Sequence, residues 1–211
     1  MCWNQPVSWI TFILGTLCTI VFATLTNNST IAWYVFFQCI ITVQLGEALI
    51  WGGKNVVGTY IAFFAVWIQP LFLTFLLFYV GIRPILCYLM LALSLVYLIV
   101  SIPHIRQLQQ NTYEPLVCGT NGEKHIDFKA WGKGGVMSTL YLVISLVCIL
   151  FLFPMYPYVA GYLLLTLLIS QVFYQRVFSS IWCWFAVFTP VVCFLTKSLP
   201  SINTMVPWVK E

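Results

Sequence analysis

Long apolar stretches, separated by short polar joints, dominate this sequence. Read with a window of about 19 residues, seven of them cover residues 7–26, 31–50, 57–79, 84–102, 135–153, 157–175 and 180–199. Each approaches the length of about 20 residues that a helix needs to cross a bilayer. The pattern predicts an all-α, polytopic membrane protein: one domain, a bundle of seven transmembrane helices.

Most joints between these stretches are short, so consecutive helices are expected to run antiparallel. Gly52 and Gly53 follow the second stretch, and Gly81 and Pro84 follow the third; such residues typically mark turns. Residues 103–134 form the one long connection. It holds seven charged residues and is expected to face water: Arg106, Glu114, Glu123, Lys124, Asp127, Lys129 and Lys133.

Basic residues predict the orientation, because Lys and Arg are enriched on the cytoplasmic side. One side receives six of them, namely Lys54, Arg106, Lys124, Lys129, Lys133 and Arg176; the other receives Arg83, Lys197 and Lys210. The N-terminus is therefore expected in the cytoplasm and the C-terminus outside or in the lumen. Asn27 and Asn28 begin overlapping N-x-[ST] sequons on the expected external side, where glycans are attached.

Composition supports a membrane location and limits the kinds of binding partner that are expected. Hydrophobic residues make up 62% of the chain and charged residues 7%, whereas soluble domains carry roughly 25% charged residues. The lipid bilayer is thus the first expected partner. The net charge of +4 comes without a dense basic tract, which excludes nucleic acid.

The eight cysteines indicate no metal centre. Nearly all lie within apolar stretches, and none forms a CxxC pair, so they are interpreted as small buried hydrophobic residues. The sequence leaves open whether a cofactor binds, and which.

Glu47 is the only acidic residue within a predicted span. Gln44, Glu47 and Trp51 follow at helical spacing and share one helix face. Ionisable groups inside a membrane are functional candidates by default. The alternative is a carboxyl near a helix end that reaches water or Lys54.

Other polar residues favour the same half of the membrane. Gln69 precedes Pro70 in the third span, Gln171 lies in the last turns of the sixth, and His104 begins the long connection. With Gln44, Glu47 and Trp51 they are predicted to line a cavity open to the cytoplasm. Alternatively, the glutamines only form hydrogen bonds between helices.

Lys197, in the last predicted span, suggests a retinal Schiff base as in seven-helix retinal proteins. Its position at the outer end favours snorkelling to the interface instead. Pro190 in the same span is expected to mark a kink.

Enzyme chemistry has little support. His104, His125 and Glu47 have ligand types that suit zinc, but no HExxH pattern, GxSxG elbow or phosphate-binding loop occurs. We do not expect an enzyme.

The N-terminal third resembles a known but uncharacterised family. Met1-Cys2-Trp3-Asn4, followed by Gln44, Glu47 and Trp51 in the second span, is similar to small multi-spanning membrane proteins of mimivirus-like giant DNA viruses and some microbes. The resemblance implies a viral or protist protein in a host endomembrane, plasma membrane or virion membrane, with Cys2 and Trp3 as motif positions. It also places Cys2 where a cysteine can be acylated, or where the pair simply anchors the helix end.

Three functional classes follow. The first is a channel or transporter for a proton, ion or small solute that uses Glu47, with kinks at Pro70 and Pro190 for gating. The second is a receptor or scaffold that binds an apolar ligand or a membrane partner. The third is a metal-dependent intramembrane enzyme.

Overall fold

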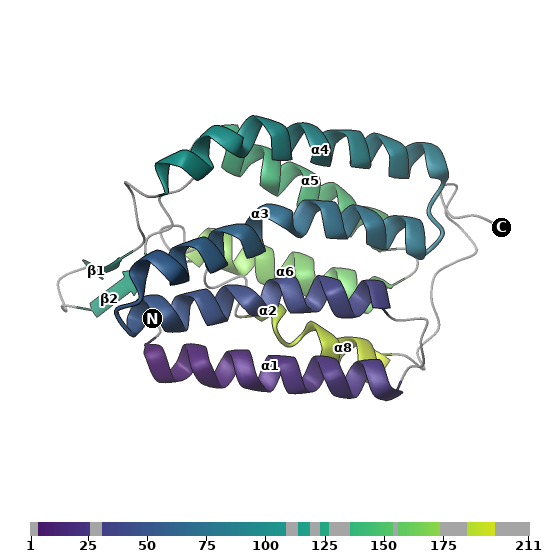
Figure 1. The fold of residues 1–211 in the computed structure, drawn as a ribbon. Helices are drawn as coiled ribbons and strands as arrows, with labels where there is room; N and C mark the ends of the chain where they lie inside the picture. The colour runs from purple at the N-terminus through teal and green to yellow at the C-terminus, as the bar shows by residue number, and fades with distance from the viewer. Residues whose placement is uncertain are drawn as a thin grey trace.

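The chain forms a bundle of helices lying side by side (Figure 1). The computed structural model describes residues 4–25, 31–108, 114–118, 123–126, 136–153, 156–173 and 185–196. These residues contain seven helices and one hairpin: α1 (Gln5–Leu25), α2 (Ile31–Trp51), α3 (Asn55–Tyr79), α4 (Pro84–Gln107), β1 (Pro115–Cys118), β2 (Glu123–Ile126), α5 (Val136–Leu152), α6 (Pro157–Phe173) and α8 (Thr189–Thr196).

Four of these helices are long and apolar enough to cross a membrane, namely Gln5–Thr24, Ala32–Trp51, Asn55–Tyr79 and Pro84–Pro103. A helix forms its backbone hydrogen bonds internally, and this is required in a membrane because hydrocarbon offers no hydrogen-bonding groups. The prediction of a helical, membrane-embedded protein is confirmed at this level. The count of seven spans and the sides of the two termini stay predictions.

Two glycine turns set the antiparallel order of α2, α3 and α4. Gly53 and Gly81 have φ angles of 78° and 82°, a left-handed conformation that glycine adopts without a steric penalty. After each glycine, the next amide donates back into the preceding helix, Lys54 to Leu49 at 2.8 Å and Ile82 to Leu77 at 3.1 Å. These bonds end each helix and reverse the chain within a few residues.

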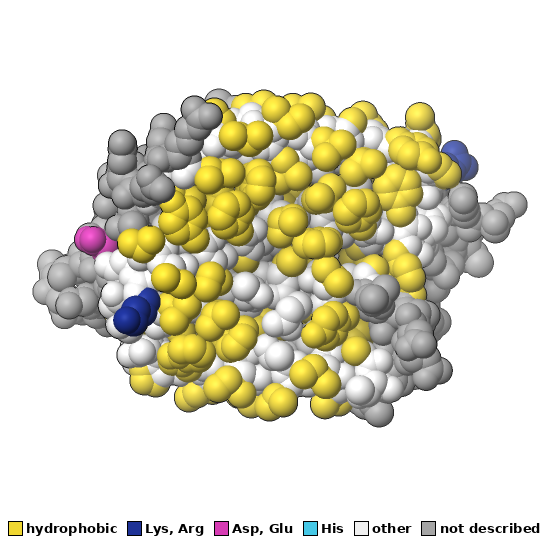
Figure 2. All heavy atoms as spheres, in the orientation of Figure 1, with side chains coloured by type: hydrophobic (Ala, Val, Ile, Leu, Met, Phe, Trp, Pro, Cys, Tyr) yellow, Lys and Arg dark blue, Asp and Glu magenta, His cyan; other side chains and the backbone are white. Residues whose placement is uncertain are grey.

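The central position belongs to α2 and α3. In their membrane-length segments 61% and 56% of the residues are buried, against 28% in α1 and α4. The outer helices expose apolar side chains such as Leu17 and Ile99. Figure 2 shows such side chains spread over the length of the bundle, with the coloured charged groups only at its two ends. This distribution fits a belt of lipid around the bundle.

The two ends of the bundle differ. We call the end where α2 meets α3 the hairpin end, because β1 and β2 lie there (Figure 1). The strands pair antiparallel, with Pro115 opposite Ile126 and Cys118 opposite Glu123. Ile126 is buried in a cluster with Ile50, Phe63 and Leu108, so the hairpin packs on the ends of three helices. It is an addition to the all-α class that the sequence analysis did not predict.

One proline lies differently from the sequence-based expectation. α4 continues through Pro103 to Gln107, beyond the expected end at residue 102, because a proline at helical φ removes only one backbone hydrogen bond.

Pro190 lies beside a break in the helix. Residues 185 and 186 are helical, a turn follows at 187 and 188, and α8 begins at Thr189 with Pro190 as its second residue. In the first helical turn its missing N–H has no helical partner to lose.

Candidate functional site

Gln44 and Glu47 face the interior of the bundle. Successive residues of a helix are rotated by about 100° around its axis. Gly46 of α2 contacts α3, and Ile41 contacts Gly15 of α1. Glu47 and Gln44 lie between these two contacts around the helix axis. The side chains of Gln44 and Glu47 are both 0% exposed. The carboxyl of Glu47 is therefore buried in the structure and does not reach the surface.

Small residues bring α3 close to this face. A Cβ atom on Gly46 would lie 2.7 Å from Cβ of Ala62, and one on Gly58 would lie 2.6 Å from the backbone oxygen of Gly46. This register places Thr59, which is fully buried, at about the level of Glu47. Close backbone approach through small residues is the usual way in which helices pack in membranes.

A serine of α1 lies at the same level. A Cβ atom on Gly52 would be 2.8 Å from Nε2 of Gln5, so α1 and α2 run antiparallel with Ser8 near residue 48. Ser8 is fully buried, and its Oγ has no hydrogen-bond partner among the described residues. The same holds for both polar atoms of the Gln44 amide. We call Ser8, Gln44, Glu47 and Thr59 the Glu47 cluster.

A second polar group lies deeper, between α3, α4 and α5. The Tyr141 hydroxyl donates to Oε1 of Gln69 at 2.5 Å, and the Tyr141 ring lies 6.4 Å from that of Tyr97. All three residues are almost completely buried. The next level of the same interface holds Thr74 and Ser94, whose hydroxyl oxygens are 3.0 Å apart.

The carbonyl of Pro70 anchors this deeper level. The hydroxyls of Thr74 and Ser94 donate to it at 3.0 and 3.3 Å, and Figure 1 shows α3 changing direction near its middle. A proline within a helix frees the carbonyl four residues before it. The carbonyl freed by the missing N–H belongs to Val66, whereas the observed bonds go to Pro70 itself.

Aromatic rings fill the bundle at the opposite end. The centroid distances are 5.7 Å for Phe22 and Phe37, 5.4 Å for Trp33 and Phe37, and 5.0 Å for Trp33 and Tyr156. This layer joins α1, α2 and the start of α6. The interior thus holds a carboxyl and amides from the Glu47 cluster to its middle, and aromatic rings near the opposite end.

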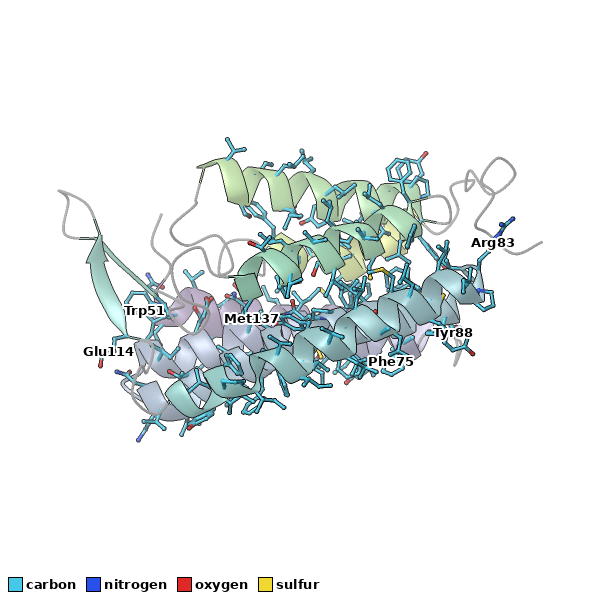
Figure 3. The ribbon with its side chains drawn as sticks, turned by 90° about the horizontal axis from the view of Figure 1, so that it is seen from above. Trp51, Phe75, Arg83, Tyr88, Glu114 and Met137 are labelled. Atoms are coloured by element: carbon cyan, nitrogen blue, oxygen red, sulfur yellow. The ribbon has the colours of Figure 1, made fainter. Side chains whose placement is uncertain are left out.

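The predicted site residues are brought together only in part. Gln44, Glu47 and Gln69 all lie in the interior, and Trp51 is partly buried against the cluster formed by Ile50 and its neighbours. Figure 3 shows Trp51 at the same end as Glu114, away from Arg83.

Several predicted residues cannot be placed in the site. The side chains of His104 in α4, His125 in β2 and Gln171 in α6 lie outside the described part, as do the residues Cys2, Trp3, Asn27, Asn28 and Lys197. Within the described residues, no three His, Cys, Asp or Glu side chains come together to hold a metal ion. The zinc and retinal hypotheses therefore stay predictions.

Tyr141 was missed by the sequence analysis, although a signal existed. Tyr141 and Ser145 are spaced one turn apart within an otherwise apolar stretch, so they share a helix face. Such a polar pair in a membrane helix predicts an inward face.

Comparisons with known proteins add no relative. No family model matches the chain, and neither a curated protein nor a solved structure resembles it. The resemblance of the N-terminal third to the viral membrane family stays a prediction, and the function has to be argued from the site.

Proposed function

We propose that this protein moves protons or monovalent cations across a membrane, with Glu47 as the group that binds them. The observation that carries the proposal is the complete burial of Glu47 and Gln44 on the inward face of α2. A buried carboxyl inside a membrane is costly, and such residues usually mark an ion or proton pathway.

The charges of the described residues favour a cation over an anion. Lys54 and Arg83 are exposed, and they flank opposite ends of α3; Figure 2 shows the coloured Lys and Arg side chains only at the two ends of the visible face. The Glu47 cluster combines one carboxyl with an amide and hydroxyls, whose oxygens can replace the water around a small cation. A carboxylate repels an anion and attracts a cation.

The distribution of polar groups favours access from the hairpin end. Polar residues continue from Glu47 towards Gln69 and Tyr141, whereas the aromatic layer around Trp33 and Phe37 fills the other end. The apolar cluster of Ile50, Phe63, Leu108 and Ile126 also covers the hairpin end. Buried polar groups with apolar side chains at both ends are the arrangement expected of a gated conductor in its closed state.

The test is proton and potassium flux into liposomes that contain the purified, full-length protein. Glu47→Gln keeps the shape of the side chain but removes its charge, and it should lower the flux by about tenfold or more. Glu114→Gln is the matched control, because Glu114 is exposed at the same end and its substitution removes the same charge.

Two outcomes would overturn the proposal. One is an equal flux in wild type and Glu47→Gln, both folded as judged by circular dichroism and gel filtration. The other is no flux from folded wild-type protein, which would favour the receptor or scaffold hypothesis.

A further inference from the structure

The hydroxyl of Ser145 behaves differently from most other buried hydroxyls of the bundle. Thr19, Thr74, Ser101 and Ser170 each donate to the carbonyl four residues earlier, at 2.8 to 3.0 Å. Such back-bonding satisfies a hydroxyl within its own helix. Oγ of Ser145 makes no such bond and has no partner among the described residues, although the side chain is 0% exposed.

Gln69 presents a second polar atom in the same state. Its Oε1 accepts the hydrogen bond from Tyr141, but its Nε2 has no partner within the described part of the chain. The side chain is 1% exposed. An amide N–H buried without a partner is costly, so a polar group that reaches it would stabilise the bundle.

These two atoms belong to one interface. On α5, Tyr141, Ser145 and Cys148 follow at helical spacing on one face. Tyr141 contacts Gln69 of α3, and Sγ of Cys148 lies 4.0 Å from Oγ1 of Thr74 of α3. Ser145 therefore lies between two contacts of α5 with α3, one helical turn from Tyr141, whose hydroxyl contacts the Gln69 amide.

We infer that Gln69, Tyr141 and Ser145 form a water-binding site in the middle of the bundle, separate from the Glu47 cluster. The site offers an amide N–H and a hydroxyl from two buried, uncharged side chains, those of Gln69 and Ser145. Buried waters typically make two to four hydrogen bonds to polar groups of this kind. The inward amide N–H makes the site less suitable for a cation.

The role of this water rests on the proposed function. Gln69 and Tyr141 lie deeper in the bundle than Glu47, towards the aromatic layer. A water held there accepts a proton on one side and releases one on the other. The water itself is unchanged afterwards, so it extends the proton pathway. We therefore assign the site as a proton relay beyond Glu47.

Infrared spectroscopy of the full-length protein in membranes tests the binding of water directly. Replacing H₂¹⁶O with H₂¹⁸O should shift an O–H stretching band of the wild type, and this band should be absent from Ser145→Ala. Ser94→Ala is the matched control, because Ser94 of α4 is equally buried but its hydroxyl donates to the Pro70 carbonyl of α3; its spectrum should keep the band.

Proton flux tests the relay. Ser145→Ala should lower the flux by about tenfold, while Ser94→Ala stays close to wild type. Absence of the isotope-sensitive band from the wild type, or its persistence in Ser145→Ala, would overturn the site, and unchanged flux in Ser145→Ala would overturn the relay. Because the infrared measurement needs no flux, a failure of Glu47→Gln to affect transport leaves the water site standing and removes only the proposed function.

Discussion

Gly46 and Gly58 bring the backbones of α2 and α3 into direct contact, since a Cβ atom on Gly58 would lie 2.6 Å from the backbone oxygen of Gly46. This crossing holds the helix that carries Glu47 against its main neighbour. Any side chain here must push the two helices apart.

We predict that Gly46→Ala destabilises the protein by about 1–3 kcal/mol, as expected for an overpacked interior. Gly161→Ala is the control, because a Cβ atom at Gly161 of α6 would meet nothing within 4 Å. Unfolding of both variants in detergent micelles provides the measurement. Equal stability of the two variants would contradict the close crossing.

The bond between Tyr141 and Gln69 is expected to contribute to stability. Tyr141→Phe leaves Oε1 of Gln69 buried without its donor, which costs about 1–3 kcal/mol. Tyr158→Phe serves as the control, since Tyr158 is 48% exposed. Thermal unfolding compares the two, and a Tyr141→Phe protein as stable as Tyr158→Phe would show that the bond contributes little.

The ends of α3 should lie on opposite sides of the membrane. Lys54 precedes α3 and Arg83 follows it, and both are exposed. In a variant whose eight native cysteines are replaced by alanine, a membrane-impermeant maleimide should label Lys54→Cys and Glu114→Cys from one side and Arg83→Cys from the other. Labelling of Lys54→Cys and Arg83→Cys from the same side would show that α3 does not cross.

Ile126 is expected to hold the hairpin on the bundle. It is 3% exposed and packs with Ile50, Phe63 and Leu108. Ile126→Ala should cost about 2–5 kcal/mol and make the chain around the hairpin more sensitive to limited proteolysis. Glu114→Ala, at an exposed position, should leave the cleavage rate unchanged, and equal rates in the two variants would argue against the docking.

Hydropathy was sufficient to predict the long helices and the inward face of α2. A carboxyl and an amide in an apolar helix have a strong reason to point away from lipid, and both side chains are buried. The glycine turns were equally visible, because a short joint with Gly53 or Gly81 leaves few other conformations.

Contacts between distant segments could not be predicted in this way. The bond from Tyr141 to Gln69 depends on α5 packing beside α3, and the spacing of apolar residues does not specify which helices are neighbours. The hairpin was missed for a related reason: its strands contain four residues each, too few for a periodic pattern, and Ile126 is buried only by helices that lie far away in the sequence.

The length of α3 has a consequence for its setting in lipid. α3 has 25 residues, which at 1.5 Å per residue correspond to about 38 Å. A hydrocarbon layer of about 30 Å is shorter than this, and a helix longer than the layer tilts to match it. Because Gly46 and Gly58 hold the backbones of α2 and α3 together, a tilt of α3 would carry the helix with Glu47 along with it.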